Sequence, residues 1–135
     1  MHRIDGLKHR KTGETLDKVL EQYVAELDID EVGIWHLVSR GEAHFSLSGD
    51  DLLEFIRRAV LALLNAGAVP VRHVPGIGYD WVLQRYYGSN PDDIANAIVQ
   101  ELAVVPLPWD SFALIEHCPW FTRPEPDLEG YVKMD

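Results

Sequence analysis

The sequence has a single cysteine, Cys118, among its 135 residues. One cysteine cannot form an internal disulfide, which excludes a disulfide-stapled secreted scaffold. The chain also has no apolar run long enough to span a bilayer, and residues 1–8 lack the uninterrupted apolar core of a signal peptide. We therefore expect a cytoplasmic protein that does not enter a membrane.

The sequence also lacks the residue spacings that hold a metal ion or build a nucleophile. Its six histidines form no H-x-x-x-H or H-E-x-x-H pair, whereas zinc needs three or four convergent ligands. His117 is adjacent to Cys118, but neighbouring side chains usually point apart. Gly76-Ile77-Gly78 has no third glycine, and no serine stands in a G-x-S-x-G elbow. We expect no metal, no cofactor and no enzymatic activity.

What the sequence does contain is the composition of one packed domain. Apolar residues make up 47% of the chain, which includes four tryptophans, and a chain of this length is usually a single domain. Residues 1–13 are polar and basic, so we expect a flexible arm there. We expect one globular domain over residues 14–123 and a tail over residues 124–135.

The charge is negative and unevenly placed. The formal net charge is −10, yet the first 11 residues hold Arg3, Lys8, Arg10 and Lys11 against Asp5 alone. The rest of the chain is therefore more acidic than the total suggests. Such a field repels phosphate backbones and attracts cationic proteins, which favours a basic protein partner and disfavours nucleic acid. The alternative interpretation is that the charge only keeps a small domain soluble.

Apolar residues at steps of three and four predict helices over residues 15–27, 30–39, 49–66 and 91–103. Strand remains open for the second, because its apolar residues include β-branched ones. Ser48 and Asn90 are expected N-caps, with Asp51 completing a capping box, and Gly67 an expected left-handed C-cap. Residues 69–84 predict a β-hairpin with its turn at residues 75–78, and Pro70 is expected to confine the first strand to a sheet edge.

This order of elements predicts a mainly α fold with a small β-hairpin (α+β), arranged as a winged-helix-like helical domain. The helix over residues 49–66 takes the place of a recognition helix, and Leu53, Ile56, Val60 and Leu63 are expected in the core. Its first turn carries Asp50 and Asp51. Because base and phosphate contacts need basic side chains, DNA binding is disfavoured. The proline-rich segment after residue 106 is expected to wrap back onto the domain.

Acidic and aromatic residues around two loops are the candidate partner-binding site. We expect the acidic residues to be exposed and the tyrosines to form an apolar anchor for a partner. The residues are Asp28, Asp30, Glu31, Asp80, Tyr86, Tyr87, Asp92 and Asp93.

Three segments carry a resemblance to known proteins. Residues 30–38 (DEVGIWHLV), residues 64–67 (LNAG) and residues 120–122 (WFT) resemble a pattern in small bacterial helical proteins of unknown function. In size, acidity and lack of catalytic residues the chain also resembles immunity proteins that neutralise toxins of contact-dependent inhibition systems. This second resemblance implies a partner that is a cognate toxin, and neither resemblance assigns a role to any residue.

Two hypotheses follow for the function. The first is a non-enzymatic immunity or antitoxin protein whose acidic face covers the basic active site of a nuclease toxin. The second is a winged-helix transcriptional regulator that binds DNA or a protein partner. The first depends on the acidic body of the chain and the second on its basic N-terminal arm.

Overall fold

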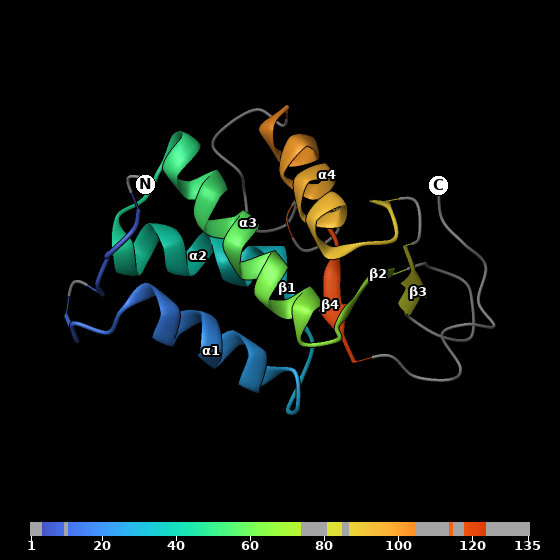
Figure 1. Cartoon of the computed structure of the whole chain (residues 1–135), viewed down its shortest axis with the longest axis horizontal. Coiled ribbons are helices and arrows are strands. Elements are labelled where there is room, and N and C mark those ends of the chain that lie inside the picture. The colour runs from blue at the N-terminus through green and yellow to red at the C-terminus, as the bar shows by residue number, and fades with distance from the viewer. Residues whose placement is uncertain are drawn as a thin grey trace.

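A computed structural model of the chain describes residues 4–9, 11–73, 81–84, 87–104, 114 and 118–123, with only the backbone at 73, 81 and 82. The described residues form helices and short strands (Figure 1). The elements are α1 (Leu16–Glu26), β1 (Val32–Gly33), α2 (Ile34–Phe45), α3 (Gly49–Asn65), β2 (Val69–His73), β3 (Trp81–Leu83), α4 (Pro91–Ala103) and β4 (Trp120–Thr122). The expected mainly α, α+β fold class is confirmed.

The ends of the helices follow from local hydrogen bonds. Thr15 accepts from the backbone N–H of Lys18 at the start of α1, and Asn90 accepts from that of Asp93 at the start of α4. Gly67 ends α3 at φ +98°, with backbone bonds to the last turn that form a Schellman motif. The expected capping box of α3 is wrong, because Ser48 is the N-cap but its side chain makes no capping hydrogen bond.

The second helix differs most from its expected range of 30–39. Residues 32 and 33 form β1, which pairs with β4, so α2 begins only at Ile34. The helix then continues through Gly41 to Phe45. A Cβ at Gly41 would lie 2.6 Å from Cδ1 of Leu52, so this glycine allows α2 to pack closely against α3 and does not break the helix.

The hydrophobic core is built around α3. Figure 1 shows α3 crossing between α1 and α4, and it packs against both of them and against α2. Its apolar residues cover more than one face of the helix, and Ile56, Val60 and Leu63 are fully buried. Leu53, which we also expected in the core, is only partly buried and packs against its edge.

The described strands form a four-stranded antiparallel sheet in the order β1-β4-β2-β3. The expected hairpin is present as β2 and β3, and its turn at residues 75–78 lies outside the described residues. The edge position expected from Pro70 is wrong, because β4 pairs with the free side of β2. Pro70 fits there since its carbonyl accepts from Gln84 N–H at 2.9 Å on the β3 side. The N–H that proline lacks would point to the same side as this carbonyl, at the end of the β2–β3 ladder.

The basic N-terminal segment is packed where the structure describes it, contrary to the flexible arm that we expected over residues 1–13. Ile4 is 1% exposed and belongs to the core, and Asp5 forms a 2.7 Å ion pair with Arg58 of α3. Lys8 forms an antiparallel bridge with Thr15. An apolar anchor at Ile4, inside a polar stretch too short to show periodicity, explains why the sequence pattern did not reveal this packing.

No helix in the described part of the chain combines the length and the apolar character needed to cross a membrane.

Truncation of Ile56 to alanine should lower the free energy of unfolding by about 2 to 5 kcal/mol, because the side chain is fully buried and leaves a cavity in the centre of the core. Denaturant unfolding measures the loss. Leu53→Ala, on the same helix but at the edge of the core, serves as the control and should cost less. A loss of about 1 kcal/mol or less for Ile56→Ala would contradict the packing of α3.

Candidate functional site

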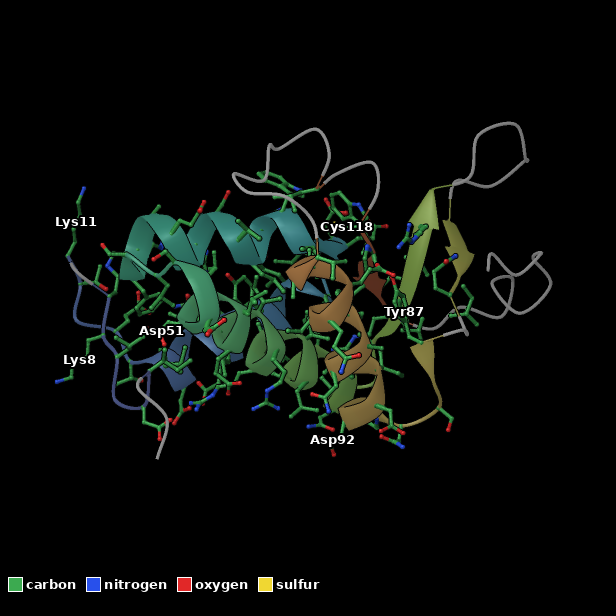
Figure 2. The ribbon with its side chains drawn as sticks, turned by 90° about the horizontal axis from the view of Figure 1, so that it is seen from above. Lys8, Lys11, Asp51, Tyr87, Asp92 and Cys118 are labelled. Carbon is green, nitrogen blue, oxygen red and sulfur yellow. The ribbon has the colours of Figure 1, made fainter. Side chains whose placement is uncertain are left out.

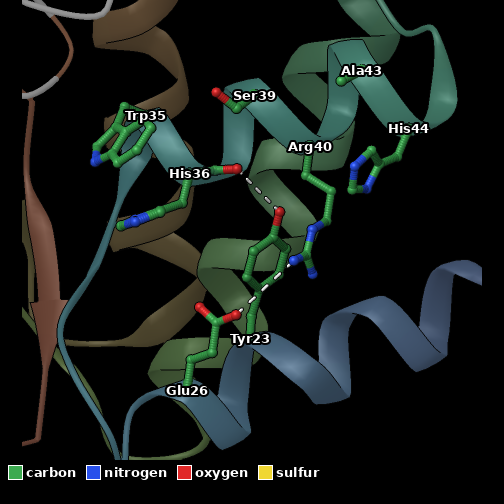
Figure 3. Close-up of a pocket in the computed structure, with 8 residues that line it drawn as sticks. All are labelled: Tyr23, Glu26, Trp35, His36, Ser39, Arg40, Ala43 and His44. Carbon is green, nitrogen blue, oxygen red and sulfur yellow. Dashed lines mark hydrogen bonds and ion pairs between the residues drawn. The ribbon is translucent and has the colours of Figure 1, made fainter.

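A pocket of about 250 Å³ lies between α1 and α2 (Figure 3). α1 contributes an aromatic ring and a carboxylate, and α2 contributes a row of polar side chains spaced by about one helical turn. The lining residues are Tyr23, Glu26, Trp35, His36, Ser39, Arg40, Ala43 and His44.

The side chain of Arg40 runs along one wall of the pocket. Its guanidinium carbon lies 5.0 Å from the centre of the Tyr23 ring, and its Nη1 donates to Gln22 Oε1 at 3.4 Å. The Tyr23 hydroxyl donates to the backbone carbonyl of His36 at 3.3 Å, and burial raises the pKa of this phenol. Tyr23 is therefore a neutral hydrogen-bond donor that ties α1 to α2.

Glu26 faces Arg40 across the pocket but does not hydrogen-bond to it. The distance from Arg40 Nη2 to Glu26 Oε1 is 4.0 Å. By contrast, Arg57 and Arg58 both reach Glu54 at 2.7 Å. The ion pair in the pocket is therefore loose, and the carboxylate of Glu26 keeps room for further donors.

A hydrogen bond from the backbone holds the His36 side chain in place, which limits the chemistry that its ring can perform. It is the third residue of α2, and its Nδ1 accepts from the backbone N–H of Gly33 at 2.9 Å. Its ring lies 4.3 Å from that of Trp35 and 5.5 Å from that of Trp120. Burial lowers the pKa of His36, although Glu26 and Asp30 act in the opposite direction. In the neutral ring the Nδ1 lone pair accepts the hydrogen bond from Gly33 N–H, so His36 is not positioned as a catalytic base.

The acidic loop, residues 28–31, adjoins this pocket. The charges of both Glu26 and Asp30 act on His36, which places the loop beside the pocket lining. Asp30 is exposed and accepts from the backbone N–H of Glu31 at 2.8 Å. Hydrogen bonds at Glu31 lower the pKa of Asp30, so the loop is anionic at neutral pH.

Asp28 holds the acidic loop to the rest of the domain. Arg123 donates to Asp28 Oδ1 through Nη2 at 3.0 Å and to the carbonyl of Ala66 through Nη1 at 2.7 Å. Arg123, directly after β4, thus links the acidic loop to the end of α3. Of the expected partner-binding residues, Asp28 is structural as well as acidic, whereas Asp30 is exposed and has no lysine or arginine at ion-pair distance among the described residues.

The expected tyrosine anchor is not confirmed where it can be examined. Tyr87 is 6% exposed, and its hydroxyl donates to Glu101 Oε1 at 2.8 Å while accepting from Arg72 at 2.9 Å. It joins β2 to α4 inside the domain, so the expectation that it is exposed is wrong. Tyr86 and Asp80 lie outside the described residues.

Asp92 and Asp93 lie on a different surface from the acidic loop. Both are exposed in the first turn of α4, and Figure 2 labels Asp92 there. The hydrogen bonds that Arg57 donates to Glu54 and, more weakly, the charge of Asp92 raise the pKa of Arg57, which places Asp92 near the middle of α3. The candidate acidic residues therefore form two patches instead of one.

Arginine charges in the described residues are neutralised within the domain. Arg40, Arg57, Arg58, Arg72 and Arg123 each form an ion pair with a carboxylate. The two arginines of α3 share Glu54, and their hydrogen bonds, Arg57 first, lower the pKa of that carboxyl to about 2.

Exposed carboxylates are less fully paired than the arginines. Within the described part of the chain, several have no lysine or arginine at ion-pair distance. They are Asp17, Asp30, Glu42, Asp50, Asp92 and Asp93. The charge that the domain offers to a partner at these positions is therefore negative.

Neither metal chemistry nor thiol chemistry is built into the described residues. No group of three His, Cys, Asp or Glu side chains among them lies close enough to hold a metal ion. Burial raises the pKa of Cys118 to about 11, so its thiol is protonated at neutral pH and is a poor nucleophile.

Sequence reasoning missed the pocket and one exposed residue. Glu26 and Arg40 lie on different helices, and only the packing of α1 against α2 brings them together. Ile29, in the middle of the acidic loop, is 85% exposed. An isoleucine between two aspartates at the end of a helix was a visible signal, because the next apolar residues belong to β1.

Comparison with known proteins gives no significant match to a family model, a curated protein or a solved structure.

Replacement of His36 by glutamine should make the stability less dependent on pH. Because the pKa of His36 is lowered in the folded protein, the unfolded chain binds the proton more readily. The wild type therefore loses stability as the pH falls below about 6.5. Glutamine at this position can keep the acceptor for Gly33, as in a capping box, without titrating.

Denaturant unfolding of both proteins at about pH 7.5 and about pH 5.5 tests this expectation. The difference in stability between the wild type and His36→Gln should shift in favour of the variant at the lower pH. An unchanged difference would show that the Gly33–His36 hydrogen bond does not couple protonation to folding.

Proposed function

We propose that this domain acts by binding a basic protein, with the acidic loop and the adjoining rim of the α1–α2 pocket as the contact surface. Its most concrete form is an immunity or antitoxin protein that covers the basic active site of a nuclease toxin. The supporting observation is the imbalance of available charge. The described arginines are paired internally, whereas exposed carboxylates such as Asp30 have no cationic partner within the part of the chain that the structure describes.

The acidic loop combines charge with an apolar contact, as protein interfaces do. Ile29 lies between Asp28 and Asp30, and the structure leaves 85% of its surface exposed. A single exposed apolar residue is common on a protein surface. Its place in an anionic loop that Arg123 anchors is what supports its role as an apolar anchor. Ile29 replaces Tyr87 in that role.

A winged-helix regulator is the second candidate, and one observation favours it. Lys8 and Lys11 are exposed without an ion pair among the described residues, and Figure 2 shows them at the opposite end of the domain from Tyr87. The helix in the recognition position argues against it, because Glu54 engages both Arg57 and Arg58. Phosphate contacts need cations that are free to reach the backbone of the duplex.

Reversal of one charge in the acidic loop should slow association with the basic partner. Asp30→Lys removes an anion that has no cationic partner among the described residues, so the fold should be unaffected. The association rate should fall, and its dependence on salt should weaken, since unlike charges steer the encounter. Glu42→Lys, which makes the same change on the exposed side of α2, is the matched control. Stopped-flow mixing with the purified product of a neighbouring toxin gene measures the association rates of the two variants and the wild type.

Truncation of Ile29 should act on dissociation instead. Ile29→Ala should speed dissociation about tenfold, because an anchoring side chain contributes mainly to the lifetime of a complex. Val104→Ala is the control, since Val104 is 82% exposed but lies at the end of α4. Equal rates for Asp30→Lys, Ile29→Ala and the wild type would refute the acidic loop as the contact surface.

The protein should not retain duplex DNA at physiological salt. The paired arginines of α3 and the negative net charge leave few cations for phosphates. A gel shift with mixed-sequence duplexes at about 150 mM salt tests this expectation. Sequence-specific retention that is lost in a Lys8→Glu, Lys11→Glu variant would instead support the winged-helix regulator.

A further inference from the structure

We propose that the α1–α2 pocket receives an arginine side chain of the basic partner, which forms its main ion pair with Glu26. This inference rests on the proposed function and specifies the chemistry at its centre. The pocket opens beside the acidic loop, so a partner that contacts Asp30 would present its next side chains to Glu26 and Trp35.

The shape of the pocket suits a long, flat cation. Its volume of about 250 Å³ is bounded at one end by the Trp35 and His36 rings, which lie 4.3 Å apart. Glu26 faces these rings from α1, on the opposite wall of the pocket (Figure 3). Guanidinium groups stack on aromatic faces and bind carboxylates through two parallel hydrogen bonds. An arginine can use both walls at once.

The carboxylate of Glu26 has capacity for such a partner. Its contact with Arg40 is 4.0 Å long, and its side chain is 42% exposed. Arg40 is held from the other side, over the Tyr23 ring and by Gln22. An incoming guanidinium can therefore bond to Glu26 without displacing Arg40 from its wall.

The charge around the pocket favours a cation over an anion. Glu26 lines the pocket and the charge of Asp30 reaches its His36, whereas Arg40 is the one guanidinium among the lining residues that the structure describes. His36 adds no positive charge at neutral pH, because burial lowers its pKa. A small carboxylate could pair with Arg40, but it would be repelled by the acidic residues around it.

A titration of the full chain with small model compounds tests the inference without the partner. N-acetyl-arginine methylamide is the probe, and the matching citrulline compound has nearly the same shape without the charge. The indole N–H signal of Trp35, assigned with a Trp35→Phe variant, reports on the pocket by NMR. We expect a saturable shift with the arginine compound and none with the citrulline compound at equal concentration.

The Glu26→Gln variant should weaken binding of the arginine compound about tenfold, the effect of losing one charge-assisted pair. Glu21→Gln is the control on the same helix, where Glu21 pairs with Lys18 outside the pocket. Equal binding of the citrulline compound, or equal affinity of Glu26→Gln and the wild type, would overturn the inference. So would a shift only with N-acetyl-glutamate methylamide, which would indicate an anion on Arg40. Since no partner is present, any of these results leaves the acidic loop to be judged by its own kinetics.

Discussion

The position of β4 between β1 and β2 is the constraint on which the rest of the domain depends. β1 and β2 do not pair with each other. Residues 120–122 therefore join the start of α2 to the end of α3. The candidate site depends on the same strand. A Cβ at Gly33 would lie 2.8 Å from the ring of Trp120, so glycine allows the contact that places His36. Arg123, directly after β4, holds Asp28 and thereby the acidic loop.

Local signals in the sequence predicted the helices. The strand β1 and the order of the strands depend on pairing between residues far apart in the chain, which local signals do not encode. Periodicity placed α1, α3 and α4 within a residue or so of their ends, and Asn90 and Gly67 acted as the expected caps. The short β1 has no sequence signature of its own, because it forms only by pairing with β4 about ninety residues later. Pairing with the distant β4 also gives Pro70 a neighbouring strand on each side, which periodicity could not predict.

The candidate site was predictable in its charge and not in its geometry. Acidic residues after the first helix pointed to the loop at Asp30, which does lie beside a pocket. The pocket itself needed the packing of α1 on α2, and the burial of Tyr87 needed the contacts of β2 with α4 through Arg72 and Glu101. Counting charges also could not show that Glu54 would engage both arginines of α3. That pairing occupies the two cations of α3 that a DNA-binding helix would need for phosphate contacts.

The most direct test of the account is the hydrogen-exchange footprint of the basic partner on this domain. Amide exchange with and without the partner reports which backbone segments are covered or stabilised by binding. The account predicts added protection over residues 26–40, where the acidic loop, β1 and the start of α2 border the pocket. Protection confined to residues 4–12 and the first turns of α3, with residues 26–40 unchanged, would contradict it and place the contact on the basic N-terminal segment.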